Sequence, residues 1–279
     1  MMVQNSTLFT RRKAIALLGA GAAMPALMTA QILAQAPAPS LDVPYVPTPQ
    51  DVVDRMLEIA KPTANDFVMD LGCGDGRMLV TAAAKFGSKG RGVDLNPVRI
   101  AEATENAKKA GVTDKIQFEV KNLFDTSIRD ATVLTMYLLP SVNLQLRPRI
   151  LDEMKPGSRI VSHAFHMADW EPDLRDEVRG RSIYHWIVPA KVAGKWNLRD
   201  GSESIVIDVY QQYQKLTGTA AREGGGSGRV TGRIKGTEVS FTVDMGSGPK
   251  TYSGQVSAGS ISGPAGSSWN AVHETQLGR

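Results

Sequence analysis

Two short segments of the chain combine carboxylates with closely spaced glycines. The first runs from Asp70 to Arg77 and reads Asp-Leu-Gly-Cys-Gly-Asp-Gly-Arg, and the second contains Asp94 and Asn96. An apolar run at residues 67–71 precedes the glycines and a helix-like pattern follows them, so the glycines form a tight turn between a strand and a helix. Glycine lets the backbone turn sharply and approach a ligand closely, and the free N–H groups of the following helix can bind the ligand's polar end.

The second segment supplies an acid at the end of the next strand. A strand over residues 91–94 places Asp94 at its carboxyl end, where a carboxylate can accept hydrogen bonds from both hydroxyls of a ribose. Asn96 and Pro97 then begin a helix as N-cap and first-turn residues. A glycine loop alone is also common in turns that bind nothing. Loop and acid together predict a pocket for a ligand that carries a nucleoside.

The spacing Asp-x-Gly-x-Gly-x-Gly differs from the Gly-x-Gly-x-x-Gly of dinucleotide-binding proteins. It resembles motif I of the class I S-adenosylmethionine-dependent methyltransferases, and the resemblance extends over residues 44–175. In that family the loop holds the methionine part of the cofactor, the acid holds the ribose, and residues after the third strand flank the adenine. The resemblance therefore implies S-adenosylmethionine as cofactor and these cofactor-binding residues: Asp70, Gly72, Gly74, Gly76, Asp94, Asn96, Asn122 and Leu123.

A narrower resemblance involves the sequence Pro-Tyr-Val-Pro-Thr-Pro at residues 44–49, the Gly-Asp-Gly-Arg form of the loop and the Asp-Leu-Asn triplet. These features are similar to the family of the mitochondrial ATP synthase c-subunit lysine methyltransferase and its bacterial relatives. In those proteins the Val-Pro-Thr-like segment lies over the cofactor, which implies that Tyr45 and Thr48 contact it. The alternative is that Thr48 and Pro49 only cap a helix predicted at residues 50–60.

Methyl transfer from a sulfonium needs few catalytic groups. The protein must hold a nucleophile in line with the S–CH₃ bond and accept or release one proton. Tyr137, after the fourth predicted strand, either lines the acceptor channel or packs against a helix. His163 and His166 end the fifth predicted strand, and one of them could accept a proton. Residues three apart in a strand face opposite sides, so no metal site is predicted. The candidate catalytic residues are Tyr137 and His163.

The N-terminus predicts export. Arg11, Arg12 and Lys13 precede an apolar stretch at residues 14–33, and Ala-Gln-Ala follows at residues 34–36. This order is typical of a secretory signal peptide of the twin-arginine type, or of an uncleaved membrane anchor, and it sends residue 37 onward to the periplasm or the outer face of the inner membrane. Without residues 1–36 the basic and acidic side chains nearly balance, so no nucleic-acid partner is predicted.

The pattern of elements predicts an α/β domain followed by an all-β domain. A Pro-rich linker at residues 37–49 leads to alternating strands and helices at residues 50–180, which indicate a doubly wound, Rossmann-like sheet. The predicted strands are residues 67–71, 91–94, 116–120, 133–137 and 159–165. Residues 181–279 are rich in glycine and contain short β-type runs, beginning with residues 183–188, that predict a small antiparallel barrel or sandwich.

Three functional hypotheses follow from the sequence. The first is an S-adenosylmethionine-dependent methyltransferase whose acceptor is unidentified, with a protein lysine as one candidate. The second is an exported protein that binds S-adenosylmethionine or a nucleoside without turnover, because that cofactor is made in the cytosol. The third is an envelope interaction protein that works through its β domain, in which the following residues form either an aromatic ligand surface or a core: Trp186, Trp196, Tyr210, Tyr213 and Trp269.

Overall fold

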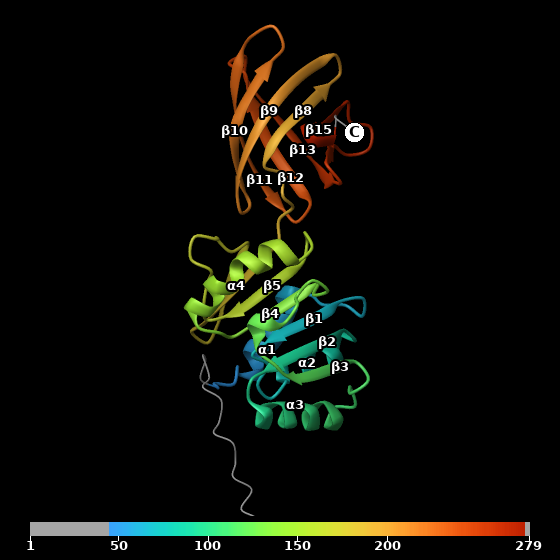
Figure 1. Ribbon diagram of the computed structural model, residues 1–279, viewed down its shortest axis with the longest axis vertical. Coiled ribbons are helices and arrows are strands. Elements are labelled where there is room, and N and C mark those ends of the chain that lie inside the picture. Colours follow the sequence, from blue (N-terminus) through green and yellow to red (C-terminus); the bar gives the residue numbers. More distant parts are fainter. Residues whose placement is uncertain (1–44, 277–279) are drawn as a thin grey trace, which may run out of the picture. The chain divides into compact units, whose positions relative to one another are not determined.

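The computed structural model describes residues 45–276 (Figure 1). The predicted signal peptide or anchor, and the linker up to residue 44, lie outside the described residues. Within residues 45–276, every helix is too short or too polar to cross a membrane.

The first domain is a seven-stranded sheet with the strand order β3-β2-β1-β4-β5-β7-β6. Strands β1 to β5 are parallel, and β7 is antiparallel to both β5 and β6. The elements are α1 (Gln50–Ala60), β1 (Phe67–Leu71), α2 (Arg77–Phe86), β2 (Lys89–Asp94), α3 (Pro97–Lys109), β3 (Ile116–Val120), η1 (Leu123–Asp125), β4 (Val133–Met136), α4 (Pro140–Glu153), β5 (Arg159–His163), β6 (Leu174–Val178) and β7 (Arg181–Ile187).

Both faces of this sheet are covered, because its strands carry apolar residues on either side. In β1, Val68 packs with the apolar faces of α1 and α2, whereas Met69 and Leu71 pack with the apolar face of α4. Successive side chains of a strand point to opposite faces, so a strand between two helical layers needs a continuous apolar run. The predicted doubly wound sheet is thereby confirmed.

The strand order reverses at β1, which lies between β2 and β4. In an open α/β sheet the crevice at such a reversal, beyond the carboxyl ends of the strands, is the usual place for a ligand. The predicted strands occur, with the second beginning at Lys89 instead of residue 91 and the fourth ending at Met136 instead of residue 137. The fifth ends at His163 instead of residue 165, because Ala164 adopts a left-handed conformation with φ of 65°. A β-branched or bulky residue would not take this conformation readily.

The assignment of residues 183–188 to the second domain is wrong. This run forms most of β7, which pairs with β5 from Ile187 opposite Arg159 to Ile183 opposite His163. Ile183 and Trp186 are fully buried on opposite faces of the first sheet. A short apolar run shows that a strand is present, but the partner strand is set by tertiary packing, so the sequence placed this strand in the wrong sheet.

The second domain is a closed up-and-down barrel, one of the two predicted forms. Each strand pairs with the next in antiparallel orientation, and the last strand pairs with the first. Its strands are β8 (Gly194–Asp200), β9 (Glu203–Gln212), β10 (Lys215–Arg222), β11 (Ser227–Lys235), β12 (Glu238–Asp244), β13 (Pro249–Ser257), β14 (Ser260–Ser262) and β15 (Trp269–His273), and η2 (Glu274–Gln276) follows. Alternate residues point into the barrel, and they fill it with apolar side chains.

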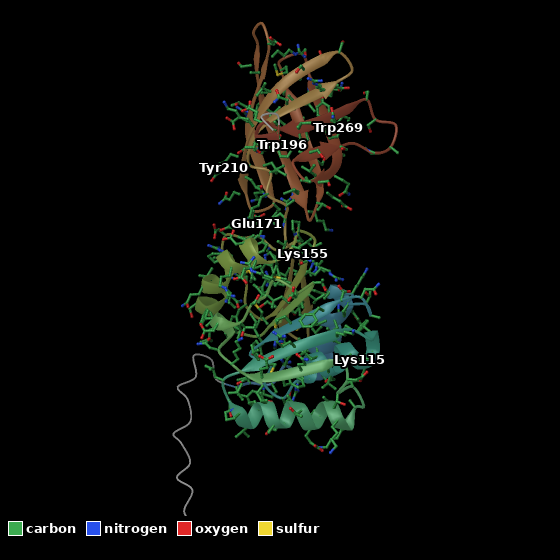
Figure 2. All side chains as sticks on the ribbon, turned by 45° about the vertical axis from the view of Figure 1, so that its right-hand side comes forward. Lys115, Lys155, Glu171, Trp196, Tyr210 and Trp269 are labelled. Carbon is green, nitrogen blue, oxygen red and sulfur yellow. The ribbon has the colours of Figure 1, made fainter. Side chains whose placement is uncertain are left out.

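The aromatic residues do not form one common surface. Trp186 belongs to the core of the first domain, whereas Trp196 is fully buried in the barrel and donates its indole N–H to the carbonyl of Val192. Tyr210 is exposed on β9, with 67% of its surface accessible (Figure 2). Trp269 packs edge-to-face against Tyr252 inside the barrel. Core packing is therefore the main use of these side chains.

Candidate functional site

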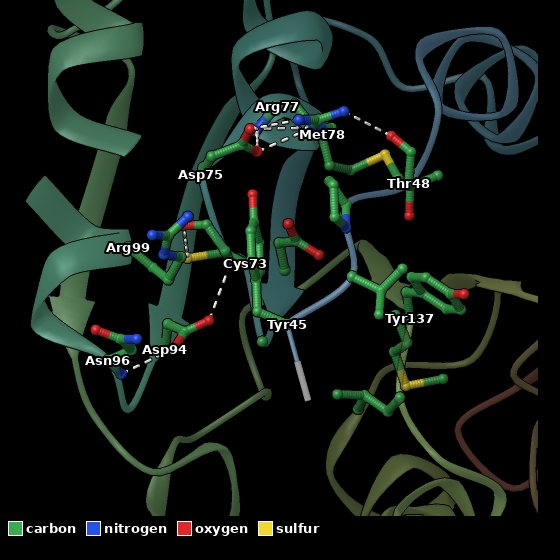
Figure 3. Close-up of a pocket in the computed structure, with 17 residues that line it drawn as sticks. Tyr45, Thr48, Cys73, Asp75, Arg77, Met78, Asp94, Asn96, Arg99 and Tyr137 are labelled. Atoms are coloured by element: carbon green, nitrogen blue, oxygen red, sulfur yellow. Dashed lines mark hydrogen bonds and ion pairs between the residues drawn. The ribbon is translucent and has the colours of Figure 1, made fainter. Parts of the chain in front are cut away.

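A cleft lies at the carboxyl ends of β1, β2 and β4 (Figure 3). It is partly open to solvent and has a cavity volume of about 90 Å³. Seventeen residues line it: Tyr45, Val46, Pro47, Thr48, Asp70, Gly72, Cys73, Gly74, Asp75, Arg77, Met78, Asp94, Asn96, Arg99, Met136, Tyr137 and Leu138. The cleft therefore lies at the reversal of strand order at β1.

The glycine loop forms one wall of the cleft. Gly72, Gly74 and Gly76 all have positive φ values, between 53° and 75°. The backbone N–H groups of Gly72 and Cys73 donate to the carbonyl of Val93 and so tie the loop to β2. Gly76 does not line the cleft, and a Cβ there would lie 2.6 Å from Phe118, so this glycine allows the loop to pack against β3.

The acid of β2 is joined to the loop. One oxygen of Asp94 accepts a hydrogen bond from the backbone N–H of Gly74 at 3.0 Å, and the other accepts one from the N–H of Asn96 at 2.8 Å. Asn96 in turn caps α3 by accepting from the N–H of Val98. A carboxylate has about four acceptor positions. Asp94 therefore retains the capacity to accept further hydrogen bonds from a ligand in the cleft.

Asp70 is an almost fully buried carboxyl in the wall of the cleft. Its oxygen accepts a hydrogen bond from Thr135 at 2.7 Å, and only 6% of its surface is accessible. Burial, with the charges of Asp94 and Asp75 and against the lowering effect of the Thr135 hydrogen bond, raises the pKa of Asp70 to about 7. Three carboxyls thus face one small volume, and a positively charged ligand would stabilise their ionised forms.

Asp75 and Arg77 form a two-pronged ion pair at the start of α2. The Arg77 guanidinium contacts both carboxylate oxygens, at 2.9 Å from Nε and 2.5 Å from Nη2. Burial raises the pKa of Asp75, but the hydrogen bonds and charge of Arg77 outweigh it and hold that pKa below its usual range. The remaining nitrogen of Arg77 donates to the carbonyl of Thr48 at 2.9 Å. This guanidinium therefore connects the loop to the segment before α1.

Tyr45 lies against the loop, and Arg99 lies over the ring of Tyr45. The ring lies so close to Gly74 that a Cβ there would be 2.5 Å from it, and the Arg99 guanidinium lies 4.4 Å from the ring centre. Tyr45 was predicted at the cofactor, but Arg99 was missed. Its only sequence signal is its place three residues after the helix cap at Asn96, which turns its side chain back toward the loop.

The opposite wall of the cleft is aromatic. Tyr137 lines it, and the His163 ring stacks on Tyr137 with 3.9 Å between ring centres. His163 is 2% exposed, and its Nδ1 lies 3.2 Å from the hydroxyl of Thr48. Burial, together with the charge of Arg181, lowers the pKa of His163 to about 4. His163 is therefore neutral near pH 7. His166 is exposed and packs edge-on against Tyr184.

Besides Gly76, two further predicted cofactor residues, Asn122 and Leu123, lie outside the lining of the cleft. Asn122 accepts a hydrogen bond from the N–H of Phe124 and caps η1, and Leu123 packs against the apolar cluster that includes α4. Their expected place beside an adenine stays a prediction. The buried thiol of Cys73 fills space against Gly92, as expected for a small residue, and burial raises its pKa strongly.

Known proteins match this chain over the cleft. The family model described as ANTKMT methyltransferase domain matches residues 70–174. A protein-lysine N-methyltransferase of Saccharolobus islandicus (strain REY15A) is 48% identical over 146 residues, which cover 52% of this chain and 91% of that protein. The mouse adenine nucleotide translocase lysine N-methyltransferase is 34% identical over 133 residues, 47% of this chain, and the match spans only 57% of the mouse protein.

A solved structure also matches. It is the crystal structure of an RNA methyltransferase from Salinibacter ruber in complex with S-adenosyl-L-homocysteine, which is 45% identical. The match covers 53% of this chain and 96% of that chain, with a TM-score of 0.52.

Proposed function

We propose that this chain methylates the side-chain amine of a protein lysine. It belongs to the class I S-adenosylmethionine-dependent methyltransferases and to the family of the Saccharolobus islandicus protein-lysine N-methyltransferase. The enzyme class and the cofactor follow from the family, and the lysine acceptor is the proposal. The observation that carries it is one cleft that joins an acidic cofactor side to an uncharged aromatic side at Tyr137.

The residues of the cleft fit the cofactor. A Cβ would lie 3.0 Å from Leu138 at Gly72 and 2.5 Å from Tyr45 at Gly74, so both glycines are needed for the shape of this wall. Asp94 keeps free acceptor capacity for ribose hydroxyls. Asp75 is paired with Arg77, whereas Asp94 and the ionised form of Asp70 add negative charge to this side, which suits a cation. When bound, S-adenosylmethionine supplies an electrophilic methyl group on a sulfonium. The residues that would hold it are therefore those of the loop and the end of β2.

The aromatic wall suits a lysine side chain. The face of an aromatic ring attracts an ammonium group, and the methylene groups of lysine pack on it as well. In the reaction the neutral amine forms the new N–CH₃ bond as the S–CH₃ bond breaks, and the nitrogen loses one proton. A histidine with a pKa near 4 is a weak base at neutral pH. We therefore assign the proton to water and assign His163 to holding Tyr137.

The test is methyl transfer by the full chain from S-adenosylmethionine with a labelled methyl group. We offer a lysine-rich protein, the same protein with its amines acetylated, and RNA. The expected result is methyl-lysine, identified by mass spectrometry, on the unmodified protein only. Label in RNA alone would contradict lysine methylation and would indicate an RNA methyltransferase, the activity named for the Salinibacter ruber relative. Absence of label from all three, with binding of the cofactor intact, would contradict the proposal.

Export of the chain stays a prediction, since it rests on residues 1–36. We propose a periplasmic or membrane-anchored location on the basis of the Arg-Arg-Lys sequence and the apolar stretch that follows it. Cell fractionation together with the N-terminal sequence of the mature protein tests this. An unprocessed chain in the cytosol would contradict it and would place the enzyme beside its source of cofactor.

A further inference from the structure

We propose that Thr48 is a positioning residue, whose carbonyl and hydroxyl together tie the cofactor loop to the acceptor wall at Tyr137. This inference rests on the proposed lysine methylation. The inference goes beyond that function, because it gives the segment before α1 a role in aligning the acceptor and not in binding the cofactor.

The carbonyl of Thr48 is fixed to the cofactor loop. It accepts a hydrogen bond from the Arg77 guanidinium at 2.9 Å, and that guanidinium is itself held by both oxygens of Asp75. Thr48 is 7% exposed, and its contact with Arg77 is partly buried, with 32% of the Arg77 side chain accessible. A charged donor held on a carboxylate has little rotational freedom left. The backbone at Thr48 is thereby set relative to the first turn of α2.

The hydroxyl of Thr48 is directed to the other wall. It lies 3.2 Å from Nδ1 of His163, which is separated from it by 115 residues of sequence and is buried as well. The hydroxyl does not cap α1, whose N-cap is Pro49 and has no side-chain hydrogen bond. Of the two roles expected for Thr48, capping is therefore wrong. A hydrogen bond at one ring nitrogen fixes the rotation of a histidine and the nitrogen that carries its proton.

His163 transmits this orientation to Tyr137. The ring centres of His163 and Tyr137 are 3.9 Å apart, with 36° between the ring planes. Phe165 also stacks on Tyr137, with 6.1 Å between their ring centres. The carbonyl of Phe165 accepts hydrogen bonds from Ser162 and Asn143, which hold the loop after β5. With the backbone held in this way, the rotation of the His163 ring depends on Thr48.

The consequence concerns the geometry of methyl transfer. The nucleophile must approach in line with the bond that breaks, and a displacement of about 1 Å can lower the rate by about 100-fold. Loss of the Thr48 hydroxyl should therefore lower kcat and leave cofactor affinity nearly unchanged. A residue that bound the cofactor directly would show the opposite pattern.

The test compares Thr48→Val, which has nearly the same shape without the hydroxyl, with Thr48→Ser, which keeps the hydroxyl. We expect Thr48→Val to lower kcat about tenfold with the dissociation constant of S-adenosyl-L-homocysteine within about twofold of the parent value, and Thr48→Ser to restore most of kcat. Thr104→Val, at an exposed helix position, is the matched control. A proportional loss of cofactor affinity, or no change in either quantity, would overturn the proposal.

A second measurement does not need activity. The chain has four histidines, so the ¹⁵N resonances of the imidazole rings can be assigned by single replacement of each. We expect the Nδ1 and Nε2 shifts of His163 to change in Thr48→Val and to return in Thr48→Ser, with His273 unaffected. Unchanged His163 shifts in Thr48→Val would overturn the proposal. If no lysine is methylated, the proposed function fails, while these spectra still decide the role of Thr48.

Discussion

Asp94 accepts a hydrogen bond from the backbone N–H of Gly74, with 3.0 Å between the two atoms and 20 positions between the two residues. The acid that is expected to bind the ribose thus also holds the loop that is expected to bind the rest of the cofactor. The two sequence segments that first suggested a pocket form one rigid unit before any ligand arrives, which lowers the entropy lost on binding.

Replacing Asp94 with alanine should therefore remove two functions at once. We expect Asp94→Ala to weaken binding of S-adenosyl-L-homocysteine by at least about tenfold, since a charge-assisted hydrogen bond contributes about 1.5–3 kcal/mol. Titration calorimetry measures this. Asp114→Ala, at an exposed carboxylate, is the control and should bind as the parent does. Parent-like affinity in Asp94→Ala would show that the acid holds neither ribose nor loop.

Cofactor binding should depend on pH through Asp70. Without ligand this carboxyl has a pKa of about 7, so below pH 7 most molecules carry its proton. A cationic sulfonium favours the ionised form, so binding releases the proton and affinity rises as pH increases toward 7 and levels off above it. Calorimetry in buffers of different ionisation enthalpy counts the released protons.

The matched comparisons for this prediction are a ligand and a variant. S-adenosyl-L-homocysteine lacks the sulfonium charge and should release fewer protons than S-adenosylmethionine. Asp70→Asn cannot titrate and should flatten the pH dependence. The prediction would be wrong if the affinity of the parent protein for S-adenosylmethionine were constant between about pH 6 and 8.

The glycine at the start of α2 should tolerate no side chain. Gly76 has a φ of 75°, and an added Cβ would lie 2.6 Å from Phe118 and 2.8 Å from Ala103. Gly111 has a φ of 69° with open space around it, so Gly111→Ala isolates the backbone strain, about 1–2 kcal/mol. We expect Gly76→Ala to lower the free energy of unfolding by about 1–3 kcal/mol more than this control. Urea unfolding measures both, and equal losses would refute close packing at Gly76.

A substitution in the core of the barrel should destabilise the barrel and leave ligand binding in the cleft unchanged. Phe241 is 3% exposed and stacks on Tyr252, so Phe241→Ala should destabilise the barrel by about 3–5 kcal/mol. Tyr210→Ala, at a 67% exposed position, should change stability by less than about 0.5 kcal/mol. Thermal unfolding followed by tryptophan fluorescence reports both domains, since Trp170 and Trp186 lie in the first domain and Trp196 and Trp269 in the barrel, and only the transition of the barrel should shift in Phe241→Ala. Affinity for S-adenosyl-L-homocysteine should stay at the parent value in both, because no residue that lines the cleft belongs to the barrel.

The sequence was informative where a local pattern fixes a local conformation. The positive φ values of Gly72, Gly74 and Gly76 follow from glycine spacing, and the place of Asp94 follows from the end of an apolar strand. Contacts between residues that are far apart in the sequence have no such local pattern. Thr48 and His163 are 115 residues apart, and nothing near either one indicates the other.

The same limit explains the error in the boundary between domains. The residues of β7 are β-formers in any sheet, and their pairing with β5 depends on two buried faces that only the folded domain supplies. Arg99 was missed for a related reason, because its contact with Tyr45 joins a helix to a segment more than 50 residues earlier.

The burial of Cys73 has a practical consequence for experiments on this chain. It is the sole cysteine of the sequence, and its thiol lies packed behind the loop with a pKa far above neutrality. A thiol of this kind reacts slowly with alkylating reagents, since the thiolate is the nucleophile. A cysteine introduced on the surface of either domain can therefore carry a dye or spin label as the fast-reacting thiol of the folded protein, with the native residue left in place.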